Sequence, residues 1–259
     1  MTNEMPILQA LELSKSFGQR PALVDVTFSL WSSEVLAIVG ESGSGKSTLL
    51  NCLSGHARVD KGSVLFQTRH DGVLDLHRIS EARRRLLERT DWGFVHQHAV
   101  EGLRMSVSAG ANVGERLMAT GNRHYGDIRN QATQWLERVE LDADRIDDLP
   151  STFSGGMRQR LQIARNLVNS PRLVFMDEPT SGLDVSVQAR LLELLRKLTR
   201  QMQLAAIIVT HDLAVARYLS DRILVMKDGC VVESGLTDQV LDDPHHPYTQ
   251  LLVSSVLPA

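Results

Sequence analysis

The segment Gly40–Ser47 reads Gly-Glu-Ser-Gly-Ser-Gly-Lys-Ser and fits the pattern G-x-x-x-x-G-K-[ST] at every fixed position. An apolar run, Val35–Val39, precedes it, and a helix-like run, Ser47–Leu53, follows it. A phosphate-binding loop requires this strand–loop–helix context, because glycines turn backbone N–H groups toward an anion and the helix adds the positive end of its dipole. The alternative, a glycine-rich surface turn, has no need of a Lys-Ser pair. The sequence therefore predicts a nucleoside triphosphate site formed by Ser42, Gly43, Ser44, Gly45, Lys46, Ser47 and Thr48.

Two carboxylates and two side chains of the loop account for the hydrolytic chemistry. Lys46 is expected to reach the β- and γ-phosphates as a point charge, and the Ser47 hydroxyl to ligate Mg²⁺. Asp177 and Glu178 follow the apolar run Leu173–Met176. At the end of a strand beside the loop, Asp177 would hold Mg²⁺ through its water shell, and Glu178 would act as the general base for water. Alone, this pair would be interpreted as the start of a helix.

A second glycine pair stands before another helix-like run. Ser154-Gly155-Gly156-Met157 opens the run Met157–Val168, with Ser154 near the N-cap position. Two glycines ahead of a helix make a second anion site. Since the loop of one chain holds one triphosphate, this second site predicts contact with the nucleotide of a partner copy, in a head-to-tail pair around two nucleotides. The alternative is a glycine turn with an ordinary N-cap.

The elements that must position these residues alternate along the chain. Short alternating strands are expected at Leu8–Leu13, Leu23–Leu30, Ser63–Gln67 and Gly72–Leu76, and buried strands at Val35–Val39, Trp92–Gln97, Leu173–Met176 and Ala205–Val209. Helices are expected at Ser80–Glu88, Asn112–Ala119, Ile128–Val139, Met157–Val168, Ser186–Met202 and Leu213–Leu219, with Ser80 as the N-cap of the first. A hairpin is expected at Arg222–Ser234 with the turn Lys227-Asp228-Gly229. Continuous apolar strands separated by helices indicate a parallel sheet covered on both faces.

The predicted fold is therefore α/β, with a P-loop core built on a mixed or parallel sheet. An N-terminal antiparallel β subdomain and a helical subdomain complete it. We expect one domain over residues 1–259. Its core comprises residues 7–95 and 169–240, its helical subdomain residues 98–168, and its C-terminal tail residues 241–259.

Composition narrows the class further. The chain has 259 residues, 42% of them hydrophobic, and a formal net charge of −3, which argues against a dedicated nucleic-acid binder. Two isolated cysteines, Cys52 and Cys230, predict a reducing compartment rather than a disulfide framework. No signal peptide is visible at Met1–Leu8, and the apolar runs fall short of the ~20 residues of a membrane-spanning helix. We expect a soluble, cytoplasmic protein. The basic run Arg83–Arg85 is interpreted as a solvated helix face, with a partner contact as the open alternative.

In order and spacing, these motifs resemble the nucleotide-binding cassette of the ABC ATPase family over nearly the whole chain. The resemblance implies that ATP and Mg²⁺ are the ligands. It also implies that Phe17 stacks on adenine, where a tyrosine is usual, and that Gln97 senses Mg²⁺ and the attacking water. His211 is similar to the switch histidine that contacts the γ-phosphate, and Asp184 lies in a loop between opposed sites.

The segment Ser154–Met157 matches the signature motif of that family with two departures nearby. Phe153 stands where leucine is usual and Met157 where glutamine is usual. In the loop Ser181–Asp184, Gly182 replaces the commoner alanine. Ser154, Gly155 and Gly156 are intact, so the resemblance implies that binding to the partner's γ-phosphate survives.

The region around Gln97, the helical insertion and the tail Pro244–Thr249 look like the ATP-binding subunits of phosphonate carbon–phosphorus lyase systems. This implies docking of lyase core subunits at the Gln97 loop and the helical subdomain, with His98 and Arg104 in the contact, and makes a second related ABC ATPase a candidate partner. The lyase chemistry would belong to other subunits, since the chain lacks the cysteine cluster that radical chemistry needs. The alternative is the energising subunit of a peptide, nickel or phosphonate importer, with a membrane permease as its partner. A module that senses ATP without hydrolysing it is disfavoured by Glu178.

Overall fold

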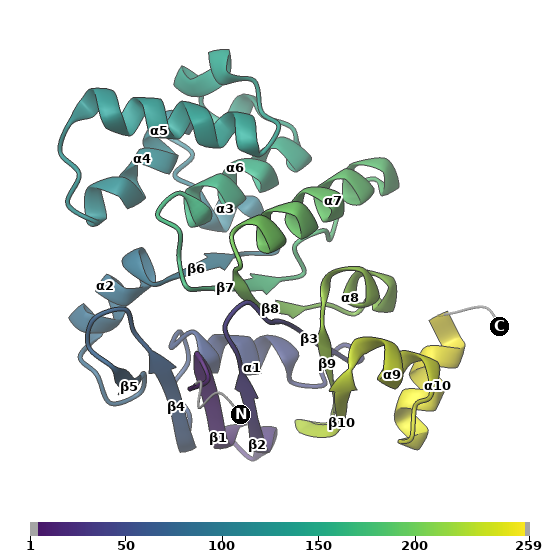
Figure 1. Cartoon of the computed structure of the whole chain (residues 1–259). Coiled ribbons are helices and arrows are strands. Elements are labelled where there is room, and N and C mark those ends of the chain that lie inside the picture. The colour runs from purple at the N-terminus through teal and green to yellow at the C-terminus, as the bar shows by residue number, and fades with distance from the viewer. Residues whose placement is uncertain (1–4, 257–259) are drawn as a thin grey trace.

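The computed structural model describes residues 5–256, and its core is a six-stranded sheet (Figure 1). The strand order is β10-β9-β3-β8-β7-β6. The strands are β3 (Val35–Val39), β6 (Trp92–Val95), β7 (Leu173–Asp177), β8 (Ala205–Val209), β9 (Arg222–Lys227) and β10 (Cys230–Leu236). Neighbouring strands pair in parallel except β10, which is antiparallel to β9. The predicted mixed sheet is confirmed. β3 and β8 are buried along their whole length, as expected for strands covered on both faces.

A four-stranded antiparallel sheet covers one side of this core. Its order is β2-β1-β4-β5, with β1 (Leu8–Phe17), β2 (Arg20–Leu30), β4 (Lys61–Gln67) and β5 (Val73–Asp75). Helix α1 (Lys46–Leu53) contributes Leu49, Leu50 and Leu53 to the same buried cluster as side chains of both sheets. The helix that follows the phosphate loop is therefore held between the two sheets by apolar packing.

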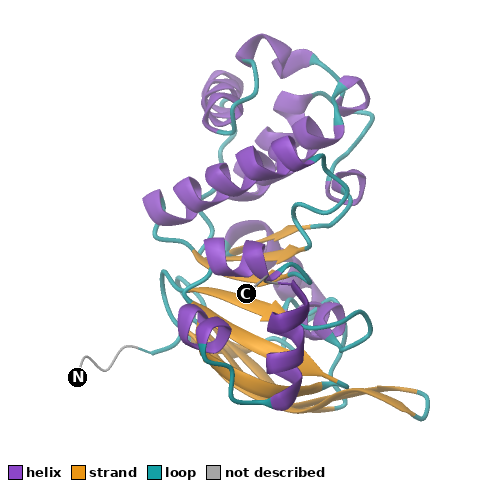
Figure 2. Ribbon diagram, turned by 90° about the vertical axis from the view of Figure 1, so that its right-hand side faces the viewer, coloured by secondary structure: helices purple, strands orange, loops and turns teal. Residues whose placement is uncertain are grey.

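Helices form a layer over the other face, as Figure 2 shows. They are α3 (Ala99–Gly102), α4 (Ala109–Ala119), α5 (Tyr125–Arg138), α6 (Gly155–Leu167) and α7 (Val185–Gln201), with 3₁₀ turns at Ala143–Asp147 and Pro150–Thr152. Two of these helices begin three residues earlier than predicted, because a side chain caps each new start. The Ser108 hydroxyl accepts from Ala111 N–H at 3.3 Å, and the ring nitrogen of His124 accepts from Asp127 N–H at 3.3 Å.

The other helices pack around the core. They are α2 (Glu81–Thr90), α8 (Leu213–Leu219), α9 (Thr237–Asp242) and α10 (Pro247–Val256). The predicted N-cap of α2 is confirmed, since Ser80 accepts from Arg83 N–H at 3.3 Å. The predicted hairpin turn is also confirmed: Asp228 and Gly229, with φ of 48° and 82°, join β9 to β10, as a type I′ turn requires. Within residues 5–256, no helix combines the length and apolar character needed to cross a bilayer.

Candidate nucleotide-binding site

A cavity of about 790 Å³ opens where the phosphate loop meets the first hairpin and the carboxyl ends of the central strands. Ten of the predicted site residues line it: Phe17, Ser42, Gly43, Gly45, Lys46, Ser47, Thr48, Gln97, Glu178 and His211. Three further lining residues, Arg20, Pro21 and Ala22, were missed from the sequence. Their signal is position alone, because they follow Phe17 across the turn that joins β1 to β2.

The phosphate loop is fixed by close packing of its backbone. Gly45 is the N-cap of α1 and has φ of 104°, and a Cβ there would stand 2.5 Å from the Ala22 carbonyl oxygen. Only glycine fits this left-handed, tightly packed position. Lys46 is buried, and its Nζ donates to the carbonyl oxygens of Gly40 and Glu41, each at 2.7 Å. Burial lowers the pKa of Lys46, against the opposing charges of Glu178 and Asp177.

The Ser47 hydroxyl faces the strand-end carboxylate predicted to share a metal with it. Ser47 Oγ donates to Asp177 Oδ1 at 3.4 Å, and Asp177 is the last residue of β7. Burial, and next the charge of Glu178, raise the pKa of Asp177. A hydroxyl and a carboxylate are hard oxygen donors of the kind that Mg²⁺ prefers, and Mg²⁺ usually keeps several waters and takes only one or two protein carboxylates. This small donor set fits Mg²⁺.

Glu178 and His211 form a contact pair in the same cavity. Glu178 Oε1 accepts from His211 N–H at 3.1 Å and lies 2.7 Å from His211 Nδ1. The backbone of Glu178 has φ of 43°, which costs a side-chain-bearing residue about 1–2 kcal/mol. Hydrogen bonds hold this strained conformation, from Glu178 N–H to the Val209 carbonyl at 2.9 Å and from Ser181 N–H to the Glu178 carbonyl at 3.0 Å. Strain of this kind is common at functional sites.

Gln97 and Phe17 were predicted to contact different parts of the nucleotide site, Gln97 the metal and the attacking water and Phe17 the adenine. The Gln97 side chain is exposed and its Nε2 donates to Ser181 Oγ at 3.1 Å, so it touches the loop that follows Glu178. Phe17 is 60% exposed, with Lys15 Nζ 5.6 Å from its ring centroid. An exposed aromatic ring at the rim of the cavity is free to stack on a nucleotide base. The structure thus brings both residues to the cavity from distant parts of the chain.

The second glycine pair lies outside this cavity. Ser154 caps α6 by accepting from Met157 N–H at 3.3 Å, and Ser154 and Gly155 are exposed. Gly156 is buried, and a Cβ there would stand 2.5 Å from Val187 on α7. Asp184 is exposed at the N-cap of α7. Of the predicted site residues, Ser44, Asp177, Ser154, Gly155, Gly156, Met157 and Asp184 are therefore not among those that line the cavity.

One loop thus presents a buried lysine and a hydroxyl to a strand-end carboxylate, at the mouth of a cavity that also holds a carboxylate–histidine pair. This geometry defines a P-loop nucleotide-binding protein. The family described as ABC transporter matches residues 23–181, more than half of the chain. The chain belongs to this family of ATP-binding cassettes, and it is an ATPase of that family.

Relatives cover almost the whole chain. It is 64% identical over 252 residues to "Putative phosphonates utilization ATP-binding protein PhnK" of Escherichia coli, covering 97% of this chain and 98% of that protein. It is 34% identical to the dipeptide transport ATP-binding protein DppD of Bacillus subtilis, covering 96% of this chain and 76% of that protein. A region described as "Oligopeptide/dipeptide transporter, C-terminal region" matches residues 232–259.

Solved structures agree with the fold. The dimeric cassette MJ0796 in a post-hydrolysis state, bound to ADP and Pi, matches with a TM-score of 0.78 and 30% identity, covering 89% of this chain and 98% of that chain. The protein cbiO1 of Clostridium perfringens, part of an ABC transporter complex, matches with a TM-score of 0.80 and 28% identity, covering 93% and 92% of the two chains.

Proposed function

We propose that this chain hydrolyses ATP at a head-to-tail dimer interface and thereby drives conformational change in an enzyme complex that breaks down phosphonates in the cytoplasm. The observation that supports a role in phosphonate breakdown is the 64% identity to a protein named for phosphonates utilization. The proposed partner is the core of a carbon–phosphorus lyase, as the sequence resemblance implied. A second related ABC ATPase is a further candidate partner in the same complex.

The residues of the cavity are assigned distinct roles. The loop N–H groups and Lys46 bind the phosphates, and Phe17 receives the adenine. Glu178 accepts a proton from the attacking water, with His211 beside it toward the γ-phosphate. Ser47, Asp177 and Gln97 would hold Mg²⁺, which when bound neutralises charge on the phosphate oxygens. The contact between Glu178 and His211 supports this assignment, because it directs a carboxylate into the cavity that the loop lines.

The position of the signature residues supports the proposed dimer. Ser154 and Gly155 are exposed and stand apart from the cavity of their own chain, so a second copy is needed to bring them to a triphosphate. Met157 and Asp184 would contribute to the same interface. Val185, beside Asp184, is 84% exposed, and an apolar side chain so exposed at this position suits a surface that a second copy covers. The dimeric cassettes among the solved relatives support this arrangement.

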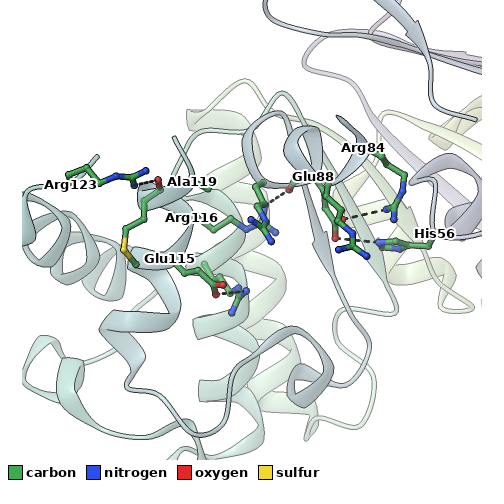
Figure 3. A pocket seen from close by; sticks show the side chains of 11 residues that line it. His56, Arg84, Glu88, Glu115, Arg116, Ala119 and Arg123 are labelled. Atoms are coloured by element: carbon green, nitrogen blue, oxygen red, sulfur yellow. Dashed lines mark hydrogen bonds and ion pairs between the residues drawn. The ribbon is translucent and has the colours of Figure 1, made fainter. Parts of the chain in front are cut away.

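A groove between α2, α4 and α6 extends the predicted docking surface (Figure 3). Its volume is about 730 Å³, and its lining is strongly basic for a chain of net charge −3, with six arginines against two glutamates. The lining residues are His56, Arg84, Arg85, Glu88, Arg89, Glu115, Arg116, Met118, Ala119, Arg123 and Arg165. Arg104, predicted in the partner contact, lies 3.7 Å from Glu115. Charge complementarity therefore favours an acidic segment of the partner polypeptide as the occupant.

Arg116, at the base of this groove, also suits an acidic occupant. It is nine-tenths buried, and burial lowers its pKa to about 10. Its acceptors, the carbonyl oxygens of Glu88 and Trp92 and the side-chain oxygen of Asn166, are all neutral. A buried cation that is solvated by neutral groups is stabilised further by an approaching carboxylate.

The groove is connected to the nucleotide cavity through a row of rings. His56 in the groove lies 4.8 Å from the Phe94 ring, and Phe94 lies 4.6 Å from the His96 ring. His96 N–H donates to Gln162 at 2.6 Å, and Gln97 follows directly. An occupant that moves His56 would thus act on the residue next to Gln97, which is how a docked partner would sense the nucleotide.

A specific observation supports a second candidate. The match of residues 232–259 to an oligopeptide/dipeptide transporter C-terminal region, together with the importer relatives, favours the energising subunit of an importer. The two functions differ in their partner, which is soluble lyase subunits in one case and a membrane permease in the other. Affinity purification from phosphonate-grown cells, with wild-type chain as bait, separates them: recovery of permeases in place of lyase subunits would favour import.

The groove is tested in the same purification with charge reversals. Arg89→Glu and Arg123→Glu alter two exposed lining residues, and we expect at least a tenfold loss of partner with basal ATP hydrolysis retained. Arg200→Glu, at an exposed position on α7 outside the groove, is the matched control. Undiminished recovery with both groove variants, and with variants of His98 and Arg104, would show that the partner docks elsewhere.

A further inference from the structure

The C-terminal segment reaches the phosphate loop. Helices α9 and α10 lie beside β9 and β10 at one end of the core sheet (Figure 1), where Tyr248 packs in a buried cluster with side chains of β3, β9 and α8. Tyr248 is 5% exposed. Its hydroxyl accepts a hydrogen bond from Glu41 N–H at 3.0 Å, and Glu41 is the second residue of the loop Gly40–Ser47.

This contact falls on a peptide group that the lysine of the loop also holds. The N–H of Glu41 and the carbonyl of Gly40 belong to one peptide, and Lys46 Nζ donates to that carbonyl at 2.7 Å. Tyr248 and Lys46 therefore bind opposite edges of the same planar unit. Hydrogen bonds joined through one peptide polarise each other, so the tyrosine strengthens the carbonyl as an acceptor for the lysine.

The backbone around this peptide packs closely against strand β9 of the core sheet. Gly40 has φ of 149°, and a Cβ there would stand 2.2 Å from the Met226 carbonyl oxygen of β9. The loop is thus pressed against the strand before it turns toward the phosphates. The N–H groups of such a loop must point inward to bind an anion. The orientation of the first peptide therefore sets the direction in which the chain enters the loop.

The tyrosine is held in place by the hairpin β9–β10. The Glu233 carboxylate of β10 accepts from the N–H groups of His245 and His246, at 2.8 and 3.0 Å. His246 Nδ1 accepts in turn from Tyr248 N–H at 3.1 Å, and Lys227 Nζ lies 5.0 Å from the Tyr248 ring centroid. These contacts anchor the backbone that leads into Tyr248, and one face of its ring, to the hairpin.

We propose that Tyr248 is a positioning residue for ATP binding, which acts through Glu41 N–H on the peptide that Lys46 holds. The proposal rests on the proposed function only in that ATP binds at this loop. Without the hydroxyl, the peptide has more orientations available. Only part of the population then has the orientation that binds ATP, so the apparent affinity for ATP falls. The C-terminal segment would then be part of the nucleotide site, although it contributes no atom to the ligand.

The test is Tyr248→Phe, which removes the hydroxyl and keeps the buried ring. We expect the Kd for ATP to rise about 3- to 10-fold, the range of one net hydrogen bond, and KM to rise in parallel with kcat near that of wild type. Tyr218→Phe, whose ring packs under Arg196 at 4.5 Å, is the matched control and should leave Kd unchanged. Glu233→Gln, which loosens the anchor of the segment, should shift Kd in the same direction as Tyr248→Phe.

The outcomes separate the two claims. If wild-type chain shows no saturable ATP binding, both the proposed function and this inference fail. If wild type binds ATP and both Tyr248→Phe and Glu233→Gln match it in Kd and KM, the inference alone is overturned. A purely structural role would lower the melting temperature of the variants and leave the Kd of the folded fraction unchanged, which also counts against positioning.

Discussion

The substitution Glu178→Gln tests the proposed general base directly. The amide keeps the size of the carboxylate and can still accept from His211 N–H, so the cavity should retain its shape. Removing a general base typically costs about 10²- to 10⁴-fold in rate, or roughly 2.7–5.4 kcal/mol of activation free energy at 1.36 kcal/mol per decade. We therefore expect phosphate release at saturating ATP to fall by at least ~10²-fold, with ATP still bound and the dimer trapped.

We expect the loss of turnover in Glu178→Gln to occur without a loss of folding or of ATP binding. After burial, the charge of Glu178 is what most raises the pKa of Asp177, so neutralising Glu178 leaves Asp177 more readily ionised for the metal. Nucleotide titration should then show unchanged or tighter ATP affinity, and size-exclusion chromatography in ATP should show a dimer. Glu193→Gln, at an exposed position on α7, is the control. Turnover of Glu178→Gln at the wild-type rate would refute the assignment of the base.

Two other substitutions address the loop and the pH dependence of stability. Lys46→Ala should weaken ATP binding at least tenfold in a nucleotide titration, because it removes a buried cation from the phosphates; wild-type affinity would contradict the role of the loop lysine. Burial lowers the pKa of His77 from the ordinary 6.5, so just below pH 6.5 the unfolded chain binds a proton more readily than the folded one, and the free energy of unfolding should decrease as pH falls. In His77→Gln, the midpoint temperature of thermal unfolding should depend less on pH between pH 7.5 and 5.5 than in wild type. An unchanged pH dependence would contradict a contribution from His77.

The parts of the fold and site that the sequence could predict are those fixed by local chemistry. A phosphate loop needs glycines and a lysine at set spacing, and a strand buried on both faces needs a continuous apolar run. The central strands, the turn at Asp228-Gly229 and the cap at Ser80 were accordingly predicted close to their observed positions. The starts of α4 and α5 were not, because a glycine in the first turn of each, Gly110 and Gly126, masked helices that Ser108 and His124 cap.

Features made by distant residues could not be predicted in the same way. The groove arginines occur at positions 84, 85, 89, 116, 123 and 165, and only the packing of α2 against α4, and of α4 against α6, gathers them. Arg83–Arg85 alone was best interpreted as a solvated face, and Arg83 does pair with Asp71 there. The contact between Tyr248 and Glu41 spans 207 positions. No local pattern encodes such a pair, since it depends on how the hairpin and the last helix pack.

The two departures in the signature region have a common structural explanation. Phe153 is 2% exposed in the core of the helical layer, and the Arg145 guanidinium lies 4.3 Å from its ring centroid. The same arginine donates to Met157 Sδ at 3.6 Å. Both side chains therefore contact the helical layer, where apolar bulk and a polarisable sulfur suit a neighbouring guanidinium. Ser154 and Gly155, between them in the chain, stay exposed with the cap of α6 intact. The Phe153 departure thus alters the support of the second glycine pair and the Met157 departure an edge of the proposed interface, while Ser154 and Gly155 keep their exposed surface for a partner's nucleotide.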